Sequence, residues 1–171
     1  MNIIQKPSAH GGGAQTPNRI IVHAMGNQID YQGNRWDAAE FLQKIGLSAH
    51  ALIAHDGTII RCRDDNRMAW HAKGHNQNTL GVEVLVENAH NLNELYECME
   101  AHNWPSSRQL WSLISLVISW CEQHDIEKIQ RHSDIDSPRK RDPGNGFPWE
   151  GFVRYTNFIL QLKGINALKT S

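Results

Sequence analysis

The sequence lacks any long run of apolar residues. No stretch approaches the roughly 18 uncharged apolar residues that a membrane-spanning helix requires. The N-terminal segment MNIIQKPSAHGGGAQT has neither the charged start nor the apolar centre of a secretory signal. These absences argue against membrane insertion and against export through a signal peptide. We therefore expect a protein that is made in the cytoplasm.

The chain also has no excess of either charge. It contains 17 Lys and Arg residues against 18 Asp and Glu residues, which gives a net charge of -1 at pH 7. Binding to a nucleic-acid backbone through counterion release needs a strongly basic surface. We therefore do not expect a nucleic acid as a partner.

Cysteine is scarce and irregularly placed. The three cysteines, Cys62, Cys98 and Cys121, form an odd set without CxxC spacing. That pattern suits neither a disulfide framework nor a zinc site built from thiolates. We interpret them as buried or unreactive thiols.

What is present is enough for one hydrophobic core. Apolar residues make up 40% of the 171 residues, and a chain of this length normally forms one domain rather than two. We expect a single domain over residues 1–171 and a monomer. Residues 1–18 contain GGGAQTP, so we expect them to form a flexible lead.

Three segments have the patterns of β-strands. Residues 19–23 form a short apolar run that ends in a histidine, and residues 80–86 are nearly all apolar apart from Glu83. Such runs are typical of buried strands, and the second is predicted to be central. The segment 51–62 contains two apolar runs around Asp56-Gly57, a dipeptide that strongly favours a hairpin turn.

The remaining segments favour helices on the faces of that sheet. Apolar residues at helical spacing predict helices over 37–45, 106–121 and 149–162, and the second opens with a capping-box pattern. We expect a short strand at 126–129 and an irregular loop with a helical turn over the polar segment 88–103. The fold class is therefore α/β (α+β), with a central mixed β-sheet flanked by helices.

Among the ten histidines, two follow predicted strands in a way that suggests a metal site. His23 closes one strand, His132 follows another, and Asp142 lies in a loop bounded by proline and glycine. A hydrolytic zinc site needs three nitrogen or oxygen ligands and an open fourth position. Spacing alone also allows three unrelated polar residues.

Five segments carry more specific motifs, and together they cover most of the chain. They are IIVH ending at His23, SAHALIAHDGTI over 48–59, AWHAKG over 69–74, NTLGVE ending at Glu83, and RHSDIDSPRKRDPG over 131–144. In this order they resemble the type 2 N-acetylmuramoyl-L-alanine amidases, a family related to phage lysozyme-type amidases and peptidoglycan recognition proteins.

The resemblance implies that His23, His132 and Asp142 bind zinc. It also implies that Lys140 is a catalytic lysine, because a cation at this position can stabilise the oxyanion that forms during amide hydrolysis. From its charge alone, Lys140 also fits a solvated member of the basic run over 139–141.

Glu83 matches the glutamate that cytoplasmic members of the family use as a general base and acid. Many phage-type members carry a tyrosine just before the histidine of the SAH segment, where this chain has Ala49. A mechanism assisted by that tyrosine is therefore excluded, and proton transfer falls to Glu83. A structural ion pair is the alternative role for this carboxylate.

Three further residues match positions on the substrate side of the family's site. Trp70 could pack on a sugar or lactyl group, and His71 could form a hydrogen bond with the peptide. His50 matches a recurrent position as well, but it could equally orient a neighbouring group.

The resemblance implies a zinc-dependent amidase that cleaves the bond between N-acetylmuramic acid and L-alanine in peptidoglycan or a muropeptide. We favour a phage or prophage endolysin that acts on the cell wall, because AWHAKG and the compact chain resemble lysins. The Ala49 and Glu83 combination resembles the cytoplasmic enzymes that recycle anhydro-muropeptides. A peptidoglycan-binding module without activity is the third alternative.

Overall fold

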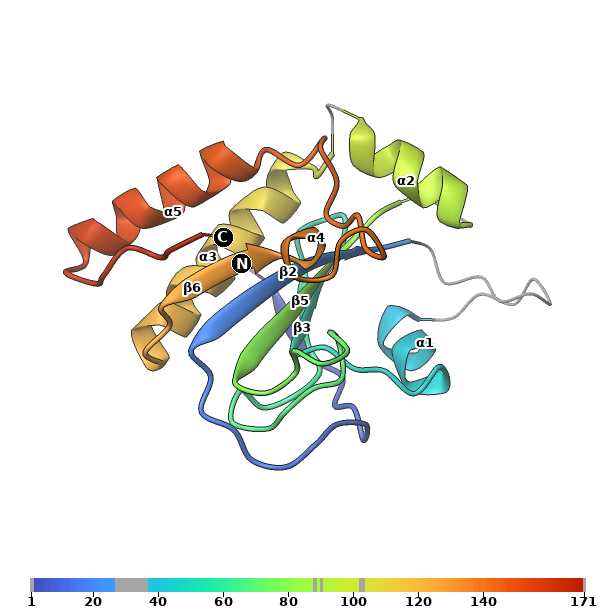
Figure 1. Ribbon diagram of the computed structural model, residues 1–171, viewed down its shortest axis with the longest axis horizontal. Helices are drawn as coiled ribbons and strands as arrows, with labels where there is room; N and C mark the ends of the chain where they lie inside the picture. The colour runs from blue at the N-terminus through green and yellow to red at the C-terminus, as the bar shows by residue number, and fades with distance from the viewer. Residues whose placement is uncertain (1, 27–36, 88, 90, 102–103, 171) are drawn as a thin grey trace.

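The computed structural model describes residues 2–26, 37–87, 89, 91–101 and 104–170. These residues form a six-stranded sheet with helices on both faces (Figure 1). The strands are β1 (Ile3–Gln5), β2 (Arg19–Met25), β3 (Ala51–Ile53), β4 (Ile59–Arg61), β5 (Thr79–Leu85) and β6 (Lys128–Arg131). The helices are α1 (Ala38–Lys44), α2 (Leu92–Glu100), α3 (Ser107–Gln123), α4 (His132–Ile135) and α5 (Trp149–Leu162). This arrangement confirms the predicted α/β class with a mixed sheet.

The sheet order places β5 and β2 in the interior. The strands lie in the order β1-β4-β3-β5-β2-β6, and of the pairs formed by these strands only β3 with β4 is antiparallel. That pair is the predicted hairpin, with Leu52 opposite Ile60. Because β5, β2 and β6 are mutually parallel, their carboxyl ends meet at one edge, where ligand sites commonly form in such sheets.

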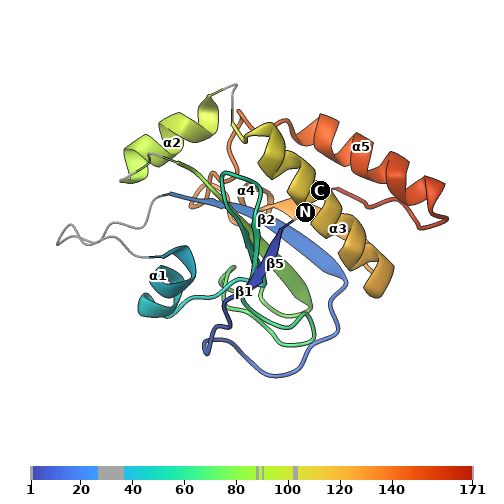
Figure 2. The ribbon, with the colours of Figure 1, turned by 180° about the vertical axis from the view of Figure 1, so that it is seen from behind.

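Alternation along β5 divides its side chains between the two faces of the sheet. Leu80 and Val82 belong to the main hydrophobic core, on the face that α3 and α5 cover (Figure 2). Thr79, Gly81 and Glu83 alternate with them and therefore lie on the opposite face. The burial of β5 on both faces explains its nearly continuous apolar sequence.

The opposite face is covered only in part. There α1 packs its alanines and Leu42 against Leu52, Ile60 and Cys62 in a smaller core cluster. Asp37 caps this helix, since its carboxylate accepts a hydrogen bond from the Ala39 amide. The cluster extends to Met25 and Leu85, the last residues of β2 and β5, and a cavity opens beside it at this edge of the sheet.

The predicted capping box begins α3. The Ser106 hydroxyl accepts a hydrogen bond from the Gln109 amide, and the Gln109 side chain accepts one from the Ser106 amide. Gln109 also donates to the carbonyls of Ile53 and Leu85, which ties the helix to the sheet. Neither α3 nor any other helix in the described ranges is long and apolar enough to cross a lipid bilayer.

Two expectations need correction. Residues 1–18 are not simply a flexible lead, because Ile3–Gln5 pair with β4 as an edge strand and Ala14 forms a bridge with Arg67. The polar segment 88–103, where a loop with a helical turn was expected, contains the nine-residue helix α2. The Asn91 side-chain oxygen caps α2 by accepting hydrogen bonds from the Asn93 and Glu94 amides.

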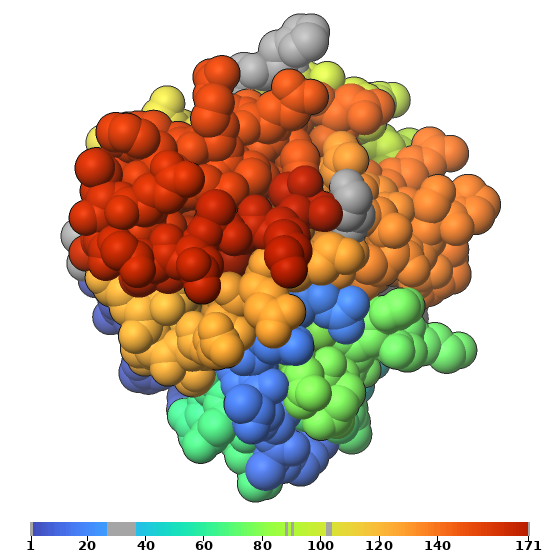
Figure 3. All heavy atoms as spheres, turned by 60° about the vertical axis from the view of Figure 1, so that its left-hand side comes forward, coloured from blue at the N-terminus to red at the C-terminus, as the bar shows by residue number. Residues whose placement is uncertain are grey.

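The C-terminal segment extends the sheet beyond β6. The Ile129 amide donates to the Lys169 carbonyl, and the Lys169 amide donates to the Glu127 carbonyl. Figure 3 shows α5 and this segment spread over β6 on one side of the molecule. The Ile129 amide and the Glu127 carbonyl at this edge are thereby paired instead of being left open.

Candidate active site

Strand pairing brings two histidines that are distant in sequence side by side. His23 lies near the end of β2, opposite Glu83 of β5. On the other side of β2, Arg131 pairs with Val22, so the next residue, His132, lies beside His23. The centroids of the two imidazole rings are 4.3 Å apart.

Asp142 reaches the same point through the loop after α4. The Ser133 amide donates a hydrogen bond to the Asp142 carbonyl and holds this loop against the helix. Asp142 Oδ2 lies 2.9 Å from His132 Nδ1 and 3.3 Å from His23 Nδ1, and the two Nδ1 atoms are 2.9 Å apart. All three side chains are buried. Three ligand atoms from three elements therefore converge on one point.

This donor set fits a metal ion. Two imidazole nitrogens and a carboxylate oxygen are ligands typical of hydrolytic zinc sites. Burial lowers the pKa of His23 to about 4, and Asp142 offsets that effect only in part, so the ring is neutral near pH 7. Burial raises the pKa of Asp142, but the adjacent imidazoles of His132 and His23 outweigh that effect, and the net pKa falls below its usual range. A neutral ring and an ionised carboxylate are the protonation states that a metal requires.

Glu83 is a buried carboxyl group beside this cluster. Burial and then the charge of Asp142 raise the pKa of Glu83 to about 8, while the ammonium group of Lys140 lowers it. A carboxyl group that titrates near neutral pH can both accept and return a proton. The position therefore suits general acid–base chemistry.

The cluster opens into one cavity of about 360 Å³, lined by His23, His132, Asp142, Glu83 and Lys140. The rest of its wall is mainly apolar and includes Phe41 and Leu42 of α1, Ile45 directly after this helix, and Leu92, Leu95 and Tyr96 of α2. A cavity with apolar walls and a few converging polar groups is the usual form of a small-ligand site. All five residues predicted for catalysis and metal binding thus share one cavity.

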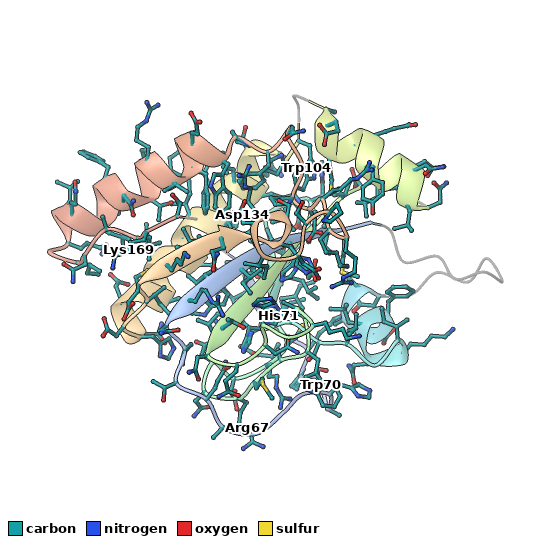
Figure 4. All side chains as sticks on the ribbon, in the orientation of Figure 1. Arg67, Trp70, His71, Trp104, Asp134 and Lys169 are labelled. Atoms are coloured by element: carbon teal, nitrogen blue, oxygen red, sulfur yellow. The ribbon has the colours of Figure 1, made fainter. Side chains whose placement is uncertain are left out.

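The three residues predicted to bind substrate lie in different environments. His71 lines the cavity and lies near the centre of the sheet, while Trp70 lies farther out (Figure 4). The Trp70 side chain faces His10, with ring centroids 6.2 Å apart, and it is not among the residues that line the cavity. The structure thus brings only His71 to the metal cluster.

His50 is fully buried and does not reach the cavity. Its Nδ1 accepts a hydrogen bond from the Gly81 amide, and its Nε2 lies 3.1 Å from the Arg67 carbonyl. The expectation that His50 contacts substrate is therefore corrected, because both of its ring nitrogens hold backbone groups. This is the orienting role left open by the sequence.

Sequence reasoning missed the wall that α2 provides. Leu92, Leu95, Tyr96 and Met99 all line the cavity. Their spacing of i, i+3, i+4 and i+7 is the apolar stripe of an amphipathic helix. That stripe was the available signal, but the polar residues between these positions obscured it.

The chain matches known proteins along most of its length. The family model described as N-acetylmuramoyl-L-alanine amidase matches residues 13–145. The chain is 25% identical over 158 residues to 1,6-anhydro-N-acetylmuramyl-L-alanine amidase AmpD of Escherichia coli (strain K12), covering 81% of each protein.

Solved structures show the same fold. N-acetylmuramoyl-L-alanine amidase LysC from Clostridium intestinale URNW superposes with a TM-score of 0.68 at 26% identity, covering 92% of this chain and 98% of that chain. Drosophila peptidoglycan recognition protein SD superposes with a TM-score of 0.61 at 18% identity, covering 85% of this chain and 90% of that chain. The second likeness is one of fold alone.

Proposed function

The chain belongs to the N-acetylmuramoyl-L-alanine amidase family, and we propose that it is a zinc-dependent member that hydrolyses the amide between N-acetylmuramic acid and L-alanine. The observation that carries this proposal is the convergence of His23, His132 and Asp142 in a cavity that also contains Glu83 and Lys140. These residues supply a metal-binding group, a proton carrier and a cation within one site.

His23, His132 and Asp142 would hold the zinc ion through Nδ1, Nδ1 and Oδ2. When bound, zinc would supply Lewis acidity, which polarises the amide carbonyl and makes water a better nucleophile near pH 7. Its positive charge would also offset the ionised Asp142 carboxylate in this buried position.

Glu83 carries the proton through the reaction. As the water oxygen attacks the lactyl carbonyl carbon, Glu83 takes a proton from that water. As the carbon–nitrogen bond breaks, Glu83 gives a proton to the leaving nitrogen of L-alanine, so that a carboxylic acid and a free peptide amine are formed. Lys140 stabilises the negative charge that develops on the carbonyl oxygen.

A peptide-release assay tests this proposal. The protein, loaded with one equivalent of zinc, is incubated with an N-acetylmuramoyl peptide, and newly exposed L-alanine amines are measured. We expect release from the zinc-loaded protein and none after treatment with a chelator. If the zinc-bound protein binds the peptide but releases no amine, a recognition module that shares only the fold becomes the correct function.

We further propose that the substrate is intact cell-wall peptidoglycan, as for an endolysin. The AWHAKG segment over 69–74 supports this role. A second candidate is the recycling of soluble anhydro-muropeptides, supported by the similarity to the Escherichia coli amidase and by Glu83 together with Ala49.

The two roles predict opposite substrate preferences. Clearing of cells stripped of their outer membrane is compared with turnover of a soluble anhydro-muropeptide at equal enzyme concentration. An endolysin clears the cells, whereas activity confined to the soluble substrate would establish the recycling role.

A further inference from the structure

A chain of hydrogen bonds runs from His23 into the protein, away from the metal cluster. His23 Nε2 lies 2.9 Å from His71 Nδ1, and His71 Nε2 lies 3.1 Å from the Thr79 hydroxyl. The Thr79 hydroxyl in turn donates to the carbonyls of His75 and Asn76, at 3.0 and 2.9 Å. His23, His71 and Thr79 are all at least nine-tenths buried.

The donor and the acceptor of each hydrogen bond in this series follow from its last member, the Thr79 hydroxyl. Carbonyl oxygens only accept, so the single proton of the Thr79 hydroxyl points to them and its oxygen must accept from His71 Nε2. A neutral imidazole carries one proton, so His71 Nδ1 is an acceptor and the proton between the two rings belongs to His23 Nε2. His23 Nδ1 then carries a lone pair, directed at His132 and Asp142.

The His71 ring is buried, and its two nitrogens contact the His23 ring and the Thr79 hydroxyl, neither of which is a carboxylate that could balance a charge, so the neutral imidazole fits this position. The reverse direction would leave two carbonyl oxygens facing a hydroxyl oxygen without a proton between them, which is unfavourable in a buried site. Along this series only one tautomer of His71 and one of His23 place a proton in every hydrogen bond from His23 Nε2 to the Thr79 hydroxyl.

The position of the His71 ring is built into the fold. A Cβ atom on Gly81 would lie 2.4 Å from His71 Cγ, so the ring rests directly on β5 where only a glycine leaves room. The Asn76 side-chain oxygen accepts hydrogen bonds from the His71 and Ala72 amides, at 3.0 and 2.7 Å, and fixes the loop that carries the ring. Thr79 and Gly81 share one face of β5 with Glu83, so a single strand serves both parts of the site.

We propose that His71 is a positioning residue, which acts through Thr79 to hold His23 in the tautomer whose Nδ1 can bind the metal. This role replaces the substrate contact expected from the sequence, and it rests on the metal site of the proposed function. Within the part of the chain that the structure describes, His132 Nε2 is buried without a hydrogen-bond partner, so His132 has no such support. The hydrogen bonds through His71 and Thr79 therefore orient His23 and not His132. Replacing a residue that forms a hydrogen bond with a metal ligand commonly lowers metal affinity by about 10- to 100-fold.

Zinc affinity of the metal-free protein, measured by competition with a chromophoric chelator, tests this inference without any substrate. In the variant His71→Phe a somewhat larger aromatic ring remains but the acceptor is lost, and we expect zinc affinity to fall about 10- to 100-fold. In His71→Asn the side-chain oxygen can take the place of Nδ1, and we expect most of the affinity to return. Thr79→Val should weaken binding in the same direction as His71→Phe.

A control variant and a kinetic readout separate this role from general damage. His124→Phe alters a histidine outside the cavity, at the end of α3, and should leave zinc affinity unchanged. At saturating zinc, His71→Phe should leave KM within about twofold. Circular dichroism confirms that each variant is folded, and Thr79→Val carries the test if His71→Phe does not fold.

Unchanged zinc affinity in His71→Phe and Thr79→Val, or a rise in KM as the main effect of His71→Phe, would overturn the inference. A wild-type protein that binds no zinc would overturn both this inference and the proposed metal site. Zinc binding without peptide release would overturn the amidase proposal alone, because the affinity measurement involves no substrate.

Discussion

Replacing Glu83 by glutamine should change how the stability of the zinc-free protein depends on pH. Glu83 is only 8% exposed, and its pKa in the folded protein is about 8, against an ordinary value of 4.5. The raised pKa means that folding disfavours the ionised form. The resulting loss in the free energy of unfolding is absent below pH 4.5, grows as the pH rises, and is complete above pH 8.

The size of the effect follows from these two pKa values. By proton linkage, Glu83 lowers the free energy of unfolding by about 1 kcal/mol at pH 5 and by up to about 5 kcal/mol at pH 8.5. Glu83→Gln has nearly the same shape and no charge, so it avoids this cost. Relative to wild type, the free energy of unfolding of the variant should therefore increase by up to about 4 kcal/mol between pH 5 and pH 8.5.

Urea unfolding of both proteins after zinc removal, at pH 5, 7 and 8.5, measures this difference. His23 and His50 have lowered pKa values and so destabilise the fold as the pH falls below 6.5. Both proteins share that effect, and it cancels in the comparison. A constant difference between wild type and Glu83→Gln across the three pH values would refute the assignment of Glu83 as a buried, desolvated carboxyl group.

Three further outcomes are expected. His132→Ala should lose bound zinc and amidase activity together, measured by metal analysis and peptide release; full activity without zinc would contradict the metal assignment. Lys140→Met should keep zinc but lower kcat about 100- to 1000-fold, because a cation for the developing oxyanion is lost, and an unchanged kcat would show that Lys140 is only a surface charge. Phe152→Ala, in the main core at 1% exposure, should cost about 3–5 kcal/mol of unfolding free energy in urea. The matched variant Phe158→Ala, at 53% exposure on the same helix, should cost under about 1 kcal/mol, and equal losses would contradict the packing of α5.

Local patterns predicted most of the secondary structure. Leu80–Val86 was recognised as a central strand because burial on both faces leaves a nearly continuous apolar run. The hairpin around Asp56-Gly57 and the capping box at Ser106 depend on neighbours in sequence, so short-range chemistry identified them.

The elements that escaped prediction have only weak local signals. Strand β1 has only three residues and is held by backbone pairing with β4. Helix α2 has an apolar stripe, but only Met99 of that stripe is buried and polar residues separate its positions, so the helical pattern is weak. In both cases distant parts of the chain supply the order.

The residues of the site were identified because five motifs resembled one family, which placed His23, His132, Asp142, Glu83 and Lys140 by position in the pattern. Spacing could not show that they meet, since His23 and His132 are 109 residues apart in the chain. The sequence by itself thus determined most of the elements and the hairpin, because these depend on local periodicity and residue type, and its motifs supplied the residues proposed to react.

Only the tertiary structure decided what those groups contact. The parallel register of β2, β5 and β6 brings the two histidines together. The glycine at position 81 leaves the space that His71 fills, and Thr79 sets the direction of the hydrogen bonds. These contacts depend on ångström-scale distances between segments far apart in the chain, which residue type and spacing do not encode.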